Sequence, residues 1–105
     1  MRLLILILLS AISAYSHAAP TERQLRLLSV NCLQCHASAH TGAPVMGNPE
    51  AWQPILAQGK QQIMTHVVEG LRGMPPLGYC SACSEADLVT LSEALAGQAL
   101  PEATP

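Results

Sequence analysis

The chain has 105 residues, of which 11% are charged and 50% are hydrophobic, and its formal net charge at pH 7 is −2. This acidic balance and the absence of a lysine- and arginine-rich stretch exclude the basic surface that nucleic-acid binding requires. The length suits a single domain, and with no Phe, one Trp and two Tyr the chain has few large side chains for a core.

Residues 1–18 have the features of a cleaved secretory signal peptide. Arg2 is a minimal charged region, residues 3–12 are an apolar run, and residues 16–18 are a small-x-small cleavage site. The run is shorter than the ~20 residues that span a bilayer, and retention as an uncleaved anchor is the alternative. We expect export to the periplasm, without stable membrane insertion after cleavage.

The first predicted helix begins after Thr21, which forms a capping-box pattern with Gln24. It is expected to cover about residues 22–30, with Leu25 and Leu28 on one face. This helix leads the chain directly into a cysteine motif.

The motif is Cys32-Leu33-Gln34-Cys35-His36. Each thiol can bond to a vinyl group of a haem, and the adjoining imidazole can bind the iron through Nε2. The same cysteine spacing occurs in disulfides, in redox dithiols and in halves of zinc sites. The histidine and the export signal favour one covalently attached haem c.

A loop and a short helix are predicted after the motif. Small residues, Gly and Pro indicate a loop over residues 37–48. Asn48 and Pro49 then have the pattern of an N-cap and a first helical residue. Pro54 and Gly59 limit this helix to one or two turns.

Two longer helices follow, separated by a loop over residues 71–79. The first covers residues 60–69 and ends at Gly70, and the second runs from Ser84 to Gly97. Their apolar stripes consist of Ile63, Met64, Val67 and Val68 in the first helix and Leu88, Leu91 and Leu95 in the second. No segment alternates like a strand, so we predict an all-α domain over residues 19–97, followed by a Pro-rich flexible tail over residues 98–105.

The second axial ligand of a haem bound at His36 has several candidates, which are Met46, Met64, Met74, His40 and His66. Met74 is favoured because the two prolines that follow it fix the backbone, so that its thioether can be held with little loss of entropy. Met64 lies on an amphipathic helix, where methionine more often fills a core. A vacant or histidine-ligated distal side is the alternative.

Over residues 25–96 the chain resembles small bacterial class I monohaem c-type cytochromes, in particular the cytochrome c-five subgroup. The matching positions are Cys32, Cys35, His36, Gly42-Ala43-Pro44, Gly47, Trp52, Gly59, Gly70, Met74-Pro75-Pro76, Gly78, Cys80 and Cys83. The resemblance implies a class I helical fold wrapped around one covalently attached haem.

The resemblance also implies roles for residues beyond the ligands. Pro44 would offer its carbonyl to Nδ1–H of His36, and Trp52 would lie beside the haem with its indole N–H near a propionate. Cys80 and Cys83 would form a disulfide, which their spacing on a helical turn and an oxidising compartment also favour. A reactive dithiol is the alternative.

One departure from the family concerns the packing of its first and last helices. Where the family usually has a glycine and aromatic residues at a close crossing, this chain has Gln24, Leu28 and Ala94. We therefore expect this crossing to be packed differently.

The function that follows is electron transfer rather than catalysis, because His/Met ligation leaves no open position on the iron. Redox donor and acceptor proteins would dock transiently at the haem edge, which we assign to Ala43, Val45, Leu77, Gly78 and Tyr79 with Lys60 and Arg72 at the rim. The alternatives are a haem-based sensor, or the haem subunit of a larger redox enzyme, with a displaceable distal ligand. A haem-free metal or thiol protein is a further alternative.

Overall fold

The computed structural model describes residues 19–102. The predicted signal peptide, residues 1–18, and the last three residues of the predicted tail lie outside this range. Within it the chain is helical and contains no β-strand, which confirms the all-α prediction. The α-helices are α1 (Glu22–Leu27), α2 (Leu33–His36), α3 (Pro49–Leu56), α4 (Lys60–Glu69) and α5 (Glu85–Ala96), and shorter helical turns are η1 (Leu28–Cys32), η2 (Ala39–Thr41) and η3 (Pro76–Tyr79).

The first helix is longer than predicted. The capping box at Thr21 is present, but the helix does not end near residue 30, because a π-helical turn, η1, carries it through the cysteine motif to His36. In this turn the Leu33 N–H bonds to the Leu28 carbonyl, five residues back, and no glycine or proline interrupts the segment. The motif is therefore part of a helix that starts at Glu22.

Leu25 and Leu28, which we predicted to share one face of the first helix, differ in burial. Leu28 is 3% exposed whereas Leu25 is 49% exposed. The side of α1 that meets α5 carries Arg23 and Gln24, which bond to Asp87, so Leu25 is turned away from the core.

The three later helices agree with the sequence prediction. Asn48 caps α3 by accepting a hydrogen bond from the Glu50 N–H at 3.2 Å, and Ser84 caps α5 by accepting from the Asp87 N–H at 3.1 Å. Helix α4 has the predicted bounds and lies between Gly59 and Gly70, whose φ angles are 84° and 88°. Only glycine adopts such angles without strain.

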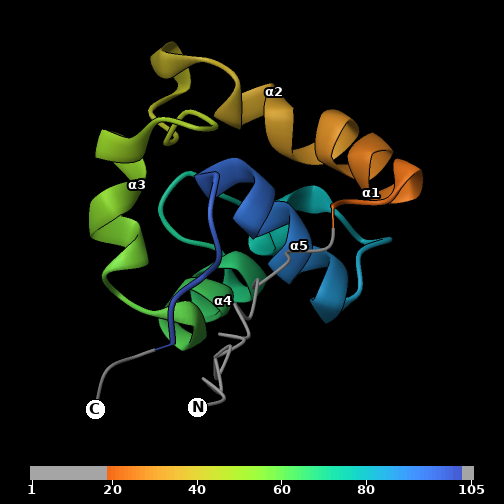
Figure 1. The fold of residues 1–105 in the computed structure, drawn as a ribbon. Helices are drawn as coiled ribbons and strands as arrows, with labels where there is room; N and C mark the ends of the chain where they lie inside the picture. The colour runs from red at the N-terminus through yellow and green to blue at the C-terminus, as the bar shows by residue number, and fades with distance from the viewer. Residues whose placement is uncertain (1–18, 103–105) are drawn as a thin grey trace, which may run out of the picture.

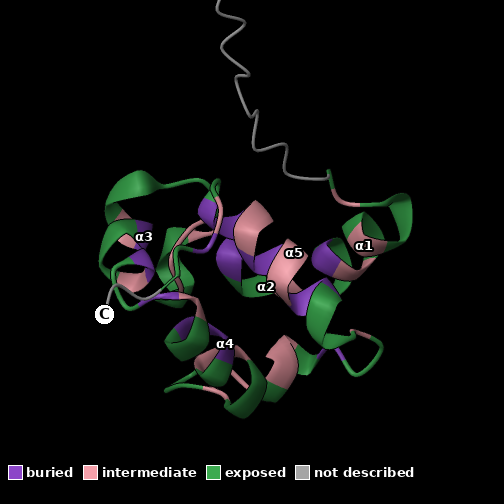
Figure 2. Cartoon of the chain, turned by 60° about the horizontal axis from the view of Figure 1, so that its bottom comes forward, coloured by how far each residue is buried: buried purple, intermediate pink, exposed green. Residues whose placement is uncertain are grey.

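Helix α5 forms the centre of the core (Figure 2). Leu88, Leu91 and Leu95 are all buried, as their spacing predicted. They pack with buried residues of the other helices, namely Leu28, Trp52, Leu56, Ile63 and Met64. The stripe predicted for α4 is narrower than expected, because Val68 at its edge is exposed.

The described part of the C-terminal segment is not the flexible tail that we predicted. Leu100 is 6% exposed and belongs to the core cluster. The Leu100 N–H donates to Glu93 Oε2 at 3.1 Å, and the Lys60 N–H donates to the Pro101 carbonyl at 2.7 Å. The proline content suggested fraying, but burial of one leucine and a backbone bond to the start of α4 hold this segment in place.

The fold brings the segment that contains the cysteine motif next to the segment that follows α4. In Figure 1, α1 and α2 run along the top, α3 lies on the left, α4 lies at the bottom, and α5 lies between them. The loop after α4 returns to the first helix, where η3 packs against both α4 and η1. In the described range no helix is long and apolar enough to cross a membrane.

Candidate haem site

The cysteine motif lies on one continuous stretch of helix. Cys32 is the last residue of η1, and Cys35 and His36 end α2. Both cysteines are free thiols: Cys35 is exposed and Cys32 is half-buried, and burial raises the pKa of the Cys32 thiol. Two accessible thiols separated by one helical turn fit the attachment of a haem c at its two vinyl groups.

His36 is buried, and its orientation is fixed by a backbone bond. Its Nδ1 lies 2.8 Å from the Pro44 carbonyl oxygen. A carbonyl oxygen can only accept, so Nδ1 carries a proton, and in the neutral ring the lone pair is then on Nε2. This is the contact that the resemblance implied, and a neutral imidazole with a free Nε2 fits an axial ligand of haem iron.

Two residues that follow Pro44 hold this segment in place by backbone hydrogen bonds. The Met46 N–H donates to the His36 carbonyl at 2.7 Å, and the Gly47 N–H donates to the Leu95 carbonyl in α5 at 2.8 Å. The histidine is thus connected through this segment to the central helix.

Trp52 lies beside His36 rather than serving only as a core residue. The two rings are stacked, with centroids 5.8 Å apart and planes inclined by 28°. The indole N–H donates to the Val45 carbonyl at 2.8 Å. The resemblance implied that this N–H would lie near a haem propionate, but in this structure it has a backbone acceptor.

Met74 lies in the loop between α4 and η3. Its N–H and carbonyl form reciprocal hydrogen bonds with Leu71, at 2.9 and 3.1 Å, which close a tight turn. A Cβ on Gly70 would lie 2.9 Å from the Met74 carbonyl oxygen, and a Cβ on Gly78 would lie 3.5 Å from Met74 Cε. A side chain at position 70 would therefore collide with the Met74 backbone, whereas the distance from Gly78 is an ordinary van der Waals contact.

This loop and the turn η3 that follows it also contain strained backbone. Arg72, Leu77 and Tyr79 have φ angles of 55°, 60° and 66°, and they are the only non-glycine residues between 19 and 102 with positive φ. Such conformations cost on the order of 1–3 kcal/mol each and persist where the surroundings enforce them. Sequence reasoning missed this feature, because none of the three is a residue type that favours positive φ.

The other candidate ligands lie elsewhere. Met64 is buried in the core, as we predicted for a methionine on an amphipathic helix. Met46 is exposed, His40 bonds to Ser38, and His66 Nε2 lies 2.8 Å from Gln62 Nε2.

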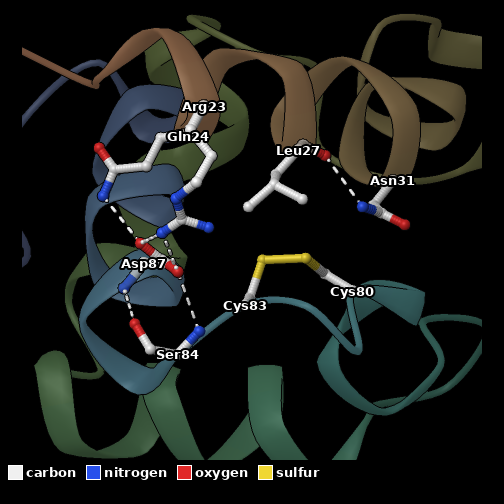
Figure 3. Close-up of a disulfide and its surroundings, with 8 residues drawn as sticks. All are labelled: Arg23, Gln24, Leu27, Asn31, Cys80, Cys83, Ser84 and Asp87. Atoms are coloured by element: carbon white, nitrogen blue, oxygen red, sulfur yellow. Dashed lines mark hydrogen bonds and ion pairs between the residues drawn. A yellow bond between two sulfur atoms is a disulfide. The ribbon is translucent and has the colours of Figure 1, made fainter.

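Cys80 and Cys83 are joined in a disulfide, with their Cα atoms 5.4 Å apart (Figure 3). Cys80 is almost completely buried. The turn η3 ends one residue before Cys80, and α5 begins two residues after Cys83. The disulfide therefore links the end of η3, which follows the loop that contains Met74 (the methionine loop), to the start of α5.

A group of polar side chains beside the disulfide joins α1 to α5. One Arg23 nitrogen lies 2.7 Å from each carboxylate oxygen of Asp87, and Gln24 Nε2 donates to the same carboxylate at 2.9 Å. The Ser84 N–H donates to it at 3.0 Å. We call Arg23, Gln24, Ser84 and Asp87 the polar clamp. The Arg23 guanidinium, followed by these other donors, holds the pKa of Asp87 well below its usual range.

Comparison with known proteins agrees with this geometry. The family model described as cytochrome c oxidase, cbb3-type, subunit III matches residues 19–93. Cytochrome c5 of Ectopseudomonas mendocina is 29% identical over 73 residues, which are 68% of this chain and 84% of that protein. Cytochrome c5 of Azotobacter vinelandii is 32% identical over 59 residues, 54% of this chain and 71% of that protein.

A solved structure is also similar. The fold matches a chain in the crystal structure of an electron transfer complex of nitrite reductase with cytochrome c, with a TM-score of 0.60 and 34% sequence identity. The match covers 71% of this chain and 93% of that chain.

Proposed function

We propose that this chain is a periplasmic one-electron carrier with His/Met-ligated iron. The premise is its family: the chain belongs to the small monohaem class I cytochromes c of the cytochrome c5 type. Members of this family carry a covalently bound haem c. The haem supplies the one-electron couple of its iron, and the polypeptide attaches it, ligates it and limits access to it.

The residues proposed to hold the haem are those of the cysteine motif and Met74. Cys32 and Cys35 would form the thioethers, and His36 would be the first axial ligand. The observation that carries this assignment is the 2.8 Å contact from His36 Nδ1 to the Pro44 carbonyl, because it assigns the proton of the neutral ring to Nδ1 and so gives Nε2 to the iron. Such a second hydrogen bond also raises the basicity of a ligating imidazole.

Met74 is proposed as the second axial ligand. Its loop is held by the reciprocal bonds with Leu71, by the close approach of Gly70 and by the Cys80–Cys83 disulfide. The packing of η3 on η1 brings this loop next to the helix that bears the motif. Methionine opposite histidine is the ligand pair of electron-carrying cytochromes and raises their reduction potential.

The proposed partners are redox proteins that dock transiently at the haem edge. Tyr79 is 79% exposed and follows the methionine loop, in which Arg72 is also exposed. Lys60 is the other predicted rim residue, and its Nζ lies 4.0 Å from Glu102 Oε1 in an ion pair. The similar chain comes from an electron transfer complex of nitrite reductase with cytochrome c, which supports docking to redox proteins. Encounters of this class are typically small and weak.

A second candidate is a haem subunit of a larger redox enzyme. The observation that favours it is the description of the matching family model, which names a subunit of an oxidase. In this case the same haem site would serve electron transfer inside an assembly instead of between free proteins.

The test is spectroscopy of the purified, exported protein. The pyridine haemochrome spectrum and the intact mass should show one haem with two thioether bonds per chain. The ferric protein should have the absorption band of iron-bound thioether, and the ferrous protein should not bind carbon monoxide. A haem protein that lacks the band and binds carbon monoxide would instead support the sensor or enzyme alternative, and co-purification in a stable complex would support the subunit.

A further inference from the structure

We infer that Trp52 is a positioning residue for His36, which fixes the orientation and basicity of the imidazole through the Val45 carbonyl and through ring stacking. This inference rests on the proposed role of His36 as an axial ligand. It differs from a propionate-binding role for the indole, because the indole N–H already donates to Val45 at 2.8 Å.

The contacts form a closed circuit around the imidazole. His36 Nδ1 donates to the Pro44 carbonyl at 2.8 Å. The next carbonyl along the chain, that of Val45, accepts from the Trp52 indole at 2.8 Å. The indole ring then returns to His36, stacked at 5.8 Å between centroids. A rotation of the imidazole must therefore disturb either the bond to Pro44 or the contact with the indole.

The circuit is anchored on two helices, so it resists displacement as a unit. Trp52 is 5% exposed and lies in α3, whose N-cap Asn48 has its own N–H bonded to the Val45 carbonyl at 3.1 Å. The Val45 carbonyl thus accepts two bonds. Two residues after Val45, the Gly47 N–H donates to the Leu95 carbonyl of α5 at 2.8 Å.

If His36 is an axial ligand, these contacts hold its Nδ1–H against the Pro44 carbonyl. A strong bond there gives the imidazole more imidazolate character, which stabilises ferric iron relative to ferrous iron. Loss of the indole N–H loosens the segment that carries Pro44 and weakens this bond. The reduction potential is then expected to rise, and the Nδ1 proton is expected to exchange faster with solvent.

The experiment compares three variants of the holoprotein. Trp52→Phe keeps an aromatic ring beside His36 but removes the N–H donor, and Trp52→Leu removes both. Leu56→Ala is the control, because Leu56 is the other buried residue of α3 and its truncation weakens the same helix without touching the circuit. The readouts are the reduction potential, the electron paramagnetic resonance spectrum of the ferric form, and the exchange rate of the His36 Nδ1 proton followed by NMR.

We expect Trp52→Phe to raise the potential and to speed exchange of the Nδ1 proton several-fold, and Trp52→Leu to change the paramagnetic spectrum as well. Leu56→Ala should lower the melting temperature and leave all three readouts at their wild-type values. The inference is overturned if both Trp52 variants lose stability but keep the wild-type potential, spectrum and exchange rate, or if Leu56→Ala shifts these readouts equally. Trp52→Phe alone decides the matter if Trp52→Leu does not fold. Failure of the proposed function is distinguishable, because the wild-type protein would then lack the paramagnetically shifted signals of an axial histidine.

Discussion

Arg23 and Asp87 join the first and last helices of the domain across 64 positions of sequence, with one guanidinium nitrogen 2.7 Å from both carboxylate oxygens. Asp87 is buried while the Arg23 side chain is about half exposed. Figure 3 shows this pair beside the Cys80–Cys83 disulfide, where the chain enters α5. The helix crossing that we expected to be packed differently is thus secured on this side by polar contacts.

The polar clamp predicts a loss of stability when its acceptor is removed. Asp87→Ala removes the carboxylate that accepts from Arg23, Gln24 and the Ser84 N–H, so the charge-assisted hydrogen bonds that join α1 to α5 are lost. We expect a lower unfolding midpoint in denaturant with an unchanged haem spectrum. Glu85→Ala is the matched control, because Glu85 is also in the first turn of α5 but is exposed. Equal midpoints for the two variants would contradict the role of the clamp.

The same contacts predict how stability depends on pH. The folded-state pKa of Asp87 lies below its usual value of 3.8, so its contribution is complete at pH values above the unfolded pKa and is lost as pH falls toward the folded one. The difference in unfolding free energy between the wild type and Asp87→Asn should be constant between about pH 5 and 7 and should shrink below about pH 4. Urea titrations at a series of pH values measure it, and a difference that grows on acidification would show that the sign is wrong.

Local signals predicted the helices well, and contacts between distant residues accounted for what was missed. The spacing of Leu88, Leu91 and Leu95 gave both the helix and its buried face, since one amphipathic helix determines that pattern by itself. No local pattern reveals that Arg23 pairs with Asp87, because the two meet only after the chain has folded. Leu100 was missed for the same reason.

In the candidate site, too, local patterns were recognised from the sequence and contacts between distant residues were not. The motif and its histidine can be recognised within five residues, whereas the partner of the Trp52 N–H depends on the path of residues 44–47. The resemblance suggested a propionate, and the structure gives the Val45 carbonyl. The strained conformations of Arg72, Leu77 and Tyr79 are imposed by the loop's surroundings and have no signature in residue type.

Replacement of Met74 tests the proposed distal ligand. Met74→Ala should abolish the absorption band of thioether-bound ferric iron and should allow the ferrous protein to bind carbon monoxide, because the sixth position is opened. Met46→Ala is the control, since Met46 is an exposed methionine that we do not assign to the iron. If Met74→Ala keeps the wild-type spectrum and Met46→Ala or Met64→Ala changes it, the assignment is wrong.

Gly70 tests the loop that presents Met74. A Cβ at this position would lie 2.9 Å from the Met74 carbonyl oxygen and 3.1 Å from the Pro76 nitrogen, at a φ of 88°. Gly70→Ala should therefore combine about 1 kcal/mol of backbone strain with a displacement of the Met74 backbone. In Gly42→Ala only the strain is expected, because φ is 80° and nothing lies within 4 Å of the added Cβ.

Both variants should lose stability in thermal unfolding, with Gly70→Ala losing more. Only Gly70→Ala should weaken the thioether band or allow exogenous imidazole to displace Met74 at lower concentration. Equal behaviour of the two variants toward imidazole would show that the close approach at Gly70 does not control the ligand.

The last prediction is that the polypeptide is largely unfolded without haem. Among the described residues the largest side chains that are fully buried are Leu91 and Cys80, so the protein core contains few large groups that are completely removed from water. Ordering each residue costs roughly 1–2 kcal/mol in backbone entropy, and helices as short as α1 to α4 are marginal when isolated. The Cys80–Cys83 disulfide closes too short a loop to restrict the unfolded chain much.

Attachment of haem changes this balance, because it adds a large apolar surface and, with the proposed ligands, ties His36 to Met74. Circular dichroism of chain produced without export, where haem is not attached, is the measurement. We expect low helix content and no cooperative melting transition, and the same sample after covalent attachment should regain both. Cys32→Ala and Cys35→Ala should correspondingly lower the yield of mature protein. Native-like helix content with a cooperative melt in the haem-free chain would show instead that Leu28, Leu91 and their neighbours form a sufficient core by themselves.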